Sequence, residues 1–143
     1  MKLLVDTNVV LDVLLDRSPF SGPATRVFSR VERGDIAGHL GATTITTVHY
    51  LAAKAIGKTD ADRAVEKLLV LFDVAPVTRT VLQSALSLGF SDYEDAVLHE
   101  AARHAGLDGI VTRDTTGFRR ATLSVYRPDE LLQMLAVRPG ERP

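Results

Sequence analysis

Residues 2–15 read KLLVDTNVVLDVLL, and their hydrophobic pattern changes at Asp6. Leu3 to Asp6 is a short apolar run that ends in this acid, and it predicts a buried strand. From Val9 to Leu14 the apolar residues recur at the three- and four-residue spacing of one helical face. The opening of the chain is therefore predicted to be a strand followed at once by a helix, with a carboxylate at the junction.

The same alternation continues along the chain. Helices are predicted at 22–33, 43–56, 60–71, 78–88, 91–105 and 128–135, and strands at 36–40, 74–77, 109–111 and 123–126. Short apolar strands that alternate with helices predict an α/β domain with a mostly parallel, buried central sheet. In such sheets ligands bind beyond the carboxyl ends of the strands, so functional residues are expected there.

The composition limits the classes of protein to which the chain can belong. A length of 143 residues fits one compact domain. The chain has no cysteine, which excludes disulfides and thiolate metal sites, and its formal net charge is −1. The protein therefore cannot bind nucleic acid through its net charge. Any contact with nucleic acid needs a local basic patch. No apolar run approaches the roughly 20 residues of a membrane span, and we expect a cytoplasmic protein without membrane contact.

Two acids follow strands directly. Asp6 ends the first strand, and Asp114 follows the strand at 109–111. Carboxylate oxygens are the ligands that Mg²⁺ prefers, so both positions favour a metal site at the edge of the sheet. Each acid also has a structural alternative, because Asp6 would cap the following helix and Asp114 would bond its own backbone in a turn.

A third acid lies at the start of the segment SDYEDAVLHEAARHAG, residues 91–106. Ser91 and Glu94 have the spacing of a capping box, which assigns Glu94 to helix capping and places Asp92 in the first turn. Asp95 lies beyond these capping positions, and its place before an apolar run favours a functional role. Unlike these acids, the histidines at 39, 99 and 104 show no paired spacing typical of metal ligands, which favours surface or packing roles.

Three segments together resemble one known family. They are LLVDTNVVLDVLLDR (residues 3–17), SDYEDAVLHEAARHAG (91–106) and GIVTRDTTGF (109–118). They resemble the PIN-domain family, and most of all the single-domain toxin ribonucleases of bacterial VapBC toxin–antitoxin pairs. The resemblance implies a three-layer α/β/α sandwich with a mostly parallel central sheet. Residues 1–135 would form this one domain, and 136–143 are expected to be a flexible tail.

The resemblance also implies a function and a site. Asp6, Asp95 and Asp114 match the acids that bind Mg²⁺ or Mn²⁺ and carry catalysis in an endoribonuclease of this kind. Asn8 and Thr112 match polar positions that orient these acids or bind a metal water. An RNA substrate, a cognate antitoxin and a homodimer are the partners that the resemblance implies.

One position departs from the family pattern. Members commonly carry a glutamate where this chain has Thr47, within the helix predicted at 43–56. We hypothesise that Asp92 replaces this carboxylate as a fourth metal ligand, because it lies three residues from Asp95 on the same helical face. The alternative is that the missing acid weakens activity or leaves a degenerate site.

Substrate phosphates need cations nearby. Arg113, Arg119 and Arg120 flank the Asp114 loop, and Arg17 follows the first helix. Because guanidinium groups match phosphate geometry, we expect Arg113 with Arg119 or Arg120 to contact RNA. The alternative for each is ordinary surface charge.

Other functional classes fit less well. A haloacid-dehalogenase-type phosphatase also has an acid after its first strand, but it needs a second acid where this chain has Asn8. A response-regulator receiver would have an acid pair at the first strand and a lysine after a late strand, and neither is present. A catalytically silent PIN-like module that binds RNA or protein remains the alternative to a ribonuclease.

Overall fold

The computed structural model describes residues 1–137 of the chain. Within that range the sheet has five strands, β1 (Lys2–Val5), β2 (Ala37–Gly41), β3 (Asp73–Ala75), β4 (Gly109–Val111) and β5 (Ser124–Tyr126). The helices are α1 (Thr7–Leu14), α2 (Ser21–Glu32), α3 (Ala42–Ile56), α4 (Lys58–Leu71), α5 (Arg79–Ala85), α6 (Tyr93–His104), the short 3-10 helix η1 (Thr115–Phe118) and α7 (Pro128–Ala136). All strand pairings in the order β3-β2-β1-β4-β5 are parallel. The predicted α/β class is confirmed.

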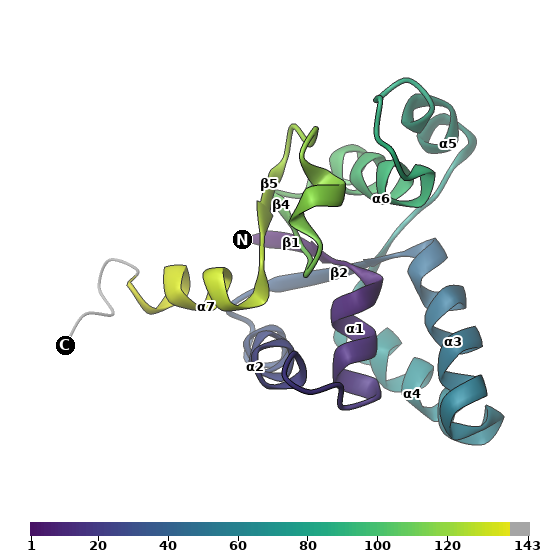
Figure 1. The fold of residues 1–143 in the computed structure, drawn as a ribbon, viewed down its shortest axis with the longest axis vertical. Coiled ribbons are helices and arrows are strands. Elements are labelled where there is room, and N and C mark those ends of the chain that lie inside the picture. Colours follow the sequence, from purple (N-terminus) through teal and green to yellow (C-terminus); the bar gives the residue numbers. More distant parts are fainter. Residues whose placement is uncertain (138–143) are drawn as a thin grey trace.

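The sheet is the middle layer of a three-layer sandwich (Figure 1). Leu3, Val5 and Val111 pack on one face with buried residues of α1, α2, α3, α4 and α7. Leu4 and Ile110 alternate with them and pack on the other face with α5 and α6. Because both faces are covered, the strands are apolar at successive positions, which is the pattern that the sequence shows.

The order of the strands creates a crevice at one edge of the sheet. The chain adds β2 and β3 on one side of β1, and then continues with β4 on the other side. At such a reversal, ligands bind beyond the carboxyl ends of the two central strands. Backbone bonds hold these ends together, since the Asp6 N–H donates to the Val111 carbonyl at 2.8 Å and the Thr112 N–H to the Tyr126 carbonyl at 2.9 Å.

The predicted elements are all present, with ends shifted by a few residues. Helix α5 is the most shortened, because Thr78 is its N-cap, where its hydroxyl accepts from the Val81 N–H at 3.2 Å, and the helix ends at Ala85. Helix α7 extends to Ala136, one residue into the segment predicted as a tail. Residues 138–143 of that segment lie outside the described residues, and the division at 135 stays a prediction. No helix of residues 1–137 is both long and apolar enough to span a membrane.

A buried polar network fixes helix α6 against the loop that precedes β5. His99 Nδ1 lies 2.9 Å from Glu100 Oε2, and His99 Nε2 accepts the Thr122 N–H at 3.1 Å. Burial alone would raise the pKa of Glu100, but hydrogen bonds from Arg103, His99 and Ser84 lower it to about 2. The packing role predicted for His99 is therefore confirmed, and the network anchors the helix whose first turn carries Asp95.

Candidate active site

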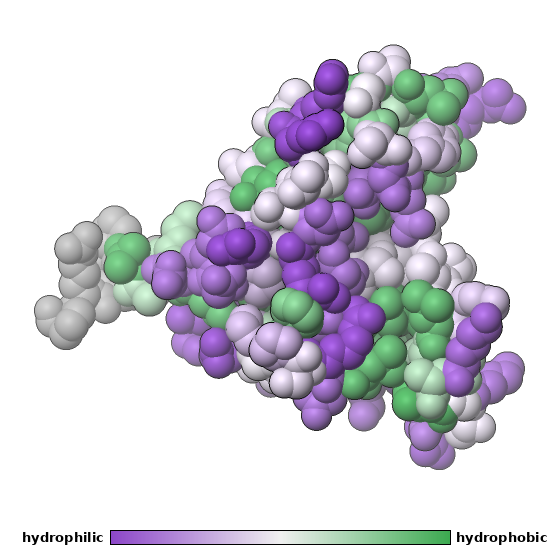
Figure 2. Space-filling view, viewed as in Figure 1, coloured by the Kyte–Doolittle hydropathy of each residue, from purple (hydrophilic) through white to green (hydrophobic). Residues whose placement is uncertain are grey.

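The carboxyl ends of β1 and β4 open onto a pocket of about 350 Å³ that we call the acid pocket. Its lining residues are Asp6, Thr7, Asn8, Leu11, Arg17, Asp92, Glu94, Asp95, Arg113 and Asp114. In Figure 2 hydrophilic residues form a band across the middle of the molecule, over the region where α1 begins in Figure 1. The acids that the sequence places on three separate segments thus meet in one pocket.

Asp6 lies at the bottom of the acid pocket with 5% of its surface exposed. It is the N-cap of α1, where its Oδ1 accepts from the Thr7 N–H at 2.7 Å. Its Oδ2 accepts from the Thr112 hydroxyl at 2.8 Å. Burial raises the pKa of Asp6, although these two hydrogen bonds lower it and the charges of Glu94 and Asp114 raise it. Asp6 therefore caps α1, as the structural interpretation predicts, and it also lines the acid pocket, as the functional interpretation requires.

Thr112 links the two strand ends through its hydroxyl group. This oxygen donates to Asp6, accepts from the Asp114 N–H at 3.0 Å and lies 3.4 Å from the Asn8 side-chain nitrogen. The Asn8 side-chain oxygen in turn accepts from the Arg113 N–H at 3.3 Å. Thr112 is fully buried, so these contacts are shielded from water. Asn8 and Thr112 thus have the orienting contacts that a supporting role requires.

Asp114 approaches the pocket from the loop after β4. It is the N-cap of η1, where its Oδ1 accepts from the Gly117 N–H at 3.2 Å, as the turn interpretation predicts. Gly117 brings it close to Asp95, because a Cβ at this glycine would lie 2.7 Å from Asp95 Oδ2 and 3.1 Å from Asp114 Oδ2. The glycine therefore leaves the space in which the two carboxylates approach each other.

The start of α6 differs from the prediction. Its N-cap is Asp92, whose Oδ1 accepts from the Asp95 N–H at 3.0 Å, so the capping box of Ser91 and Glu94 is wrong. The helix begins two residues after Ser91, and a carboxylate at position 92 caps the third helical amide. Asp95 is thus within the first turn, and Glu94 is freed from capping and lines the acid pocket. Glu94 is the acid that the sequence interpretation missed.

Asp95 also has a raised pKa. Its half-buried position raises the pKa of Asp95 to about 7, and the negative charges of Asp6, Asp92, Asp114 and Glu94 raise it in the same direction. Among residues 1–137 the Asp95 carboxylate accepts no hydrogen bond that would offset this cost. Binding of a proton or of a cation would lower this cost, because either one neutralises the charge of the carboxylate.

The whole arrangement corresponds to a known domain type. A family model described as PIN domain matches residues 2–116 of the chain. The chain belongs to the PIN-domain family.

Solved structures share this PIN-domain fold at low sequence identity. FitAcB from Neisseria gonorrhoeae is 22% identical at a TM-score of 0.67, covering 88% of this chain and 97% of that chain. A toxin–antitoxin complex from Klebsiella pneumoniae is 19% identical at 0.68, covering 88% and 97%. VapC20 of Mycobacterium tuberculosis, described as a toxin that cleaves the sarcin-ricin loop, is 16% identical at 0.65, covering 82% and 95%. No curated protein sequence matches the chain.

The carboxylate oxygens in the acid pocket of this PIN domain are suitable ligands for a hard divalent cation. Within residues 1–137, no group of three or more acidic or histidine side chains is arranged so that it could hold a metal ion as placed. Mg²⁺ is usually held by one or two carboxylates together with waters and substrate phosphate, so a complete protein cage is not required. The crowded carboxylates and the raised pKa of Asp95 show a local excess of negative charge that such an ion would neutralise.

Two arginines border the acids, and a buried acid fixes both. Asp12 is 1% exposed, and its Oδ1 accepts from Arg17 Nε at 2.8 Å while its Oδ2 accepts from Arg113 Nε at 2.8 Å. Arg17 and Arg113 line the acid pocket, and the RNA contact predicted for Arg113 stays a prediction. Arg119 and Arg120 line a neighbouring pocket beside Gly117 instead. Their predicted RNA contact would therefore lie in this neighbouring pocket and not among the acids.

The position of the missing glutamate is not at the pocket. Thr47 is half-buried in α3 and is absent from the lining, whereas Thr44 of the same helix is buried and its hydroxyl lies 2.9 Å from that of Thr7. Asp92 and Glu94 both line the pocket. The hypothesis that Asp92 supplies the fourth carboxylate stays a prediction, with Glu94 as a second candidate for the same role.

We expect Thr112→Val to impair the PIN-domain site without blocking folding. Valine keeps the shape but leaves the Asp6 Oδ2 and the Asp114 N–H without their shared partner. Loss of such an orienting contact lowers metal affinity or activity by about 10- to 100-fold, and a buried group without a partner costs about 1–3 kcal/mol. Cleavage rates and thermal unfolding measure the two effects.

The matched control for this variant is Thr43→Val. The Thr43 hydroxyl is buried and has no hydrogen-bond partner within residues 1–137. The same chemical change there should leave cleavage and unfolding close to those of the wild type. Equal effects of the two valine substitutions would contradict the orienting role of Thr112.

Proposed function

We propose that the protein is a metal-dependent endoribonuclease that hydrolyses RNA phosphodiester bonds at the acid pocket. The observation that carries the proposal is the meeting of Asp6, Asp95 and Asp114 in one pocket at the reversal of the sheet. These acids come from segments as far apart as the end of β1 and the start of η1, and burial together with the neighbouring negative charges raises the pKa of Asp95 to about 7. Acids that gather in a cleft and shift the pKa of one of their number are typical of a functional site.

Each residue of the pocket has a distinct task in this proposal. Asp6, Asp95 and Asp114 would hold Mg²⁺ or Mn²⁺, with Asp92 as a further ligand. The bound ion would activate a water molecule and stabilise charge on the attacking and leaving oxygens. Thr112 holds the Asp6 carboxylate in place, and Asn8 supports the Arg113 backbone. Arg17 and Arg113, fixed by Asp12, would neutralise phosphates of the substrate.

The arginines are expected to set the salt dependence of RNA binding. Arg113→Gln removes one phosphate contact, and the slope of log affinity against log salt should fall by about 1. Arg120→Gln measured in parallel tests whether the neighbouring pocket also contacts RNA. Fluorescence anisotropy with a labelled single-stranded RNA measures both slopes, and an unchanged slope for Arg113→Gln would contradict its contact.

We further propose that the protein is the toxin of a VapBC-type pair and forms a homodimer. Two of the fold neighbours are described as a toxin and as a toxin–antitoxin complex. A cognate antitoxin would cover the acid pocket and present an arginine to its carboxylates, where the negative charge is concentrated. A small open reading frame beside the gene supports this proposal, and its absence favours a stand-alone role in RNA processing.

The decisive experiment is a cleavage assay on total RNA with mapped cut sites. The wild type should cleave in Mg²⁺ or Mn²⁺ and stop when EDTA is added. The alternative function, a silent module that binds RNA or protein, predicts RNA binding without cleavage in either metal. The missing glutamate at Thr47 is the observation that favours this alternative.

A further inference from the structure

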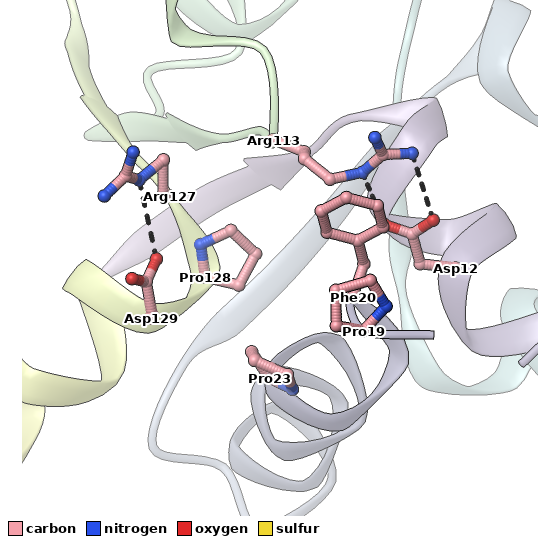
Figure 3. Close-up of a pocket in the computed structure, with 8 residues that line it drawn as sticks. All are labelled: Asp12, Pro19, Phe20, Pro23, Arg113, Arg127, Pro128 and Asp129. Carbon is pink, nitrogen blue, oxygen red and sulfur yellow. Dashed lines mark hydrogen bonds and ion pairs between the residues drawn. The ribbon is translucent and has the colours of Figure 1, made fainter. Parts of the chain in front are cut away.

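A second cavity of about 400 Å³ adjoins the acid pocket. One wall consists of Pro19, Phe20 and Pro23, before and within the start of α2, and the other of Arg127, Pro128 and Asp129 at the start of α7 (Figure 3). We call it the proline cavity. Its volume lies in the range of about 300–1,000 Å³ that is usual for small-ligand sites.

The proline cavity presents flat surfaces that are already in place. Phe20 is 41% exposed although it is a large apolar residue. The Arg113 guanidinium carbon lies 4.0 Å from the centroid of the Phe20 ring, and two hydrogen bonds to Asp12, at 2.8 and 3.2 Å, hold it there. Aromatic rings and guanidinium planes are the surfaces on which proteins stack unpaired bases.

The charges of the cavity balance within its own lining. Arg113 pairs with Asp12, and Arg127 lies 3.6 Å from Asp129. Because each arginine has a carboxylate beside it, the lining offers donors and acceptors without an excess of positive charge. Such a lining favours a planar, neutral group with polar edges over a free phosphate.

The two cavities share one lining residue. Arg113 lines both the acid pocket and the proline cavity, and Asp12 lines the latter while it holds Arg17 at the former. A strand whose phosphate lies over the acid pocket would therefore extend along Arg113 into the proline cavity. The group that follows a phosphate in such a strand is a nucleoside.

We propose that the proline cavity binds one unpaired nucleobase of the RNA strand, stacked on the exposed side of the pair that Phe20 and the Arg113 guanidinium form. This rests on the proposed ribonuclease function, because it takes the acid pocket as the place of the scissile phosphate. The base would be the one next to the cleaved bond, and the site would select substrates that are single-stranded at this position.

The test is a double-mutant cycle that combines one substitution in the protein with one abasic nucleotide in the RNA. The probe is a labelled single-stranded RNA that contains a cut site, compared with versions that carry one abasic nucleotide at successive positions. Binding is measured in EDTA, where metal-dependent cleavage does not interfere. For the wild type, one abasic position beside the cut site should weaken binding about tenfold or more, which is the range of a base–aromatic stack.

Phe20→Ala should weaken binding of the intact RNA by a similar factor and should abolish the effect of the abasic nucleotide. Phe20→Tyr should restore both. Tyr50→Ala is the matched control, because Tyr50 is also an exposed aromatic residue with a cation over its ring, Lys54 Nζ at 4.5 Å, but lines neither cavity. Thermal unfolding verifies that Phe20→Ala is folded.

Failure of the wild type to bind RNA, or an abasic series without a sensitive position, would overturn the proposal. So would equal losses by Phe20→Ala for intact and abasic RNA, because Phe20 would then contribute to binding without stacking on that base. If the wild type cleaves nothing in metal, the abasic series is measured on a single-stranded RNA that it binds; a cycle that holds there keeps the base site while the proposed nuclease function fails.

Discussion

Asp6→Asn is expected to lower RNA cleavage by at least about 1,000-fold, because a metal ion contributes several kcal/mol of charge stabilisation to the transition state and each 1.36 kcal/mol is a factor of ten. Asp6 is the most buried of the three proposed ligands, so no solvent-exposed neighbour can take its place. The amide keeps the shape, and its one oxygen accepts from either the Thr7 N–H or the Thr112 hydroxyl; the metal-free melting temperature measures the cost of losing the other contact. The loss would therefore come from the removed charge and not from unfolding.

The same substitution has a readout that does not depend on activity. In the wild type, Mg²⁺ or Mn²⁺ should raise the melting temperature, because the ion binds the folded carboxylates and relieves their repulsion. Asp6→Asn should remove most of this increment while the metal-free melting temperature stays equal or rises. Differential scanning calorimetry at millimolar metal measures both quantities.

Asp60→Asn is the matched control for this experiment. Asp60 is an exposed aspartate in the first turn of α4, outside the acid pocket. It should behave as the wild type in cleavage and in metal stabilisation. Retention of cleavage within tenfold by Asp6→Asn would contradict the site.

The second large effect concerns the pH dependence of stability in the absence of metal. The pKa of Asp95 is about 7 in the folded protein, compared with an ordinary value of 3.8. Between these values the folded state binds more protons than the unfolded state, so the free energy of unfolding should fall as the pH rises from about 4 to about 7. The raised pKa of Asp6 acts in the same direction.

Asp95→Asn should flatten this part of the stability profile. Denaturant unfolding in EDTA at a series of pH values measures the difference between the variant and the wild type. The variant should gain stability relative to the wild type as the pH passes upward through 7. Parallel profiles for the two proteins would show that Asp95 does not titrate in this range.

In the wild type, bound metal should counteract the loss of stability that occurs as the pH rises. A divalent ion competes with the proton on Asp95, so apparent metal affinity should rise with pH until about 7 and then level off. Isothermal titration with Mn²⁺ at pH 5.5 and pH 8 tests this expectation. Comparison of Asp92→Asn with Asp95→Asn in the same titration tests whether Asp92 is a ligand, since an unchanged affinity in the former would leave that place to Glu94.

The local pattern of the chain was sufficient for the main architecture. The change of period at Asp6 and the apolar run at 109–111 identified β1 and β4, because hydrophobic periodicity is a local property. Parallel order then placed Asp6 and Asp114 at the same edge, since all strands of such a sheet end on one side. The structure brings both acids into one pocket, as expected.

Local pattern was less informative where alternative caps compete. Ser91 and Asp92 are both good N-caps, and the sequence does not show which amide is left without a partner until the helix is packed. In the structure Asp92 is the N-cap and α6 begins at Tyr93, so Glu94 is not a capping residue and lines the acid pocket. The same limit applies to Arg119 and Arg120, whose side of η1 depends on the path of the loop.

The sequence alone thus predicted the α/β class and the places of Asp6 and Asp114, because strands, helices and the positions after them are set by neighbours in the chain. The PIN type and the role of Asp95 were predicted from the resemblance of three segments to that family. The tertiary structure alone decided how these acids interact. Asp12 binds Arg17 and also Arg113, which lies 101 residues further along the sequence than Asp12. The pKa of Asp95 rises to about 7 through burial and neighbouring charges, most of them from other segments. The proline cavity likewise forms between α2 and α7. Burial and long-range distance depend on how the layers pack, and no local pattern of residues records them.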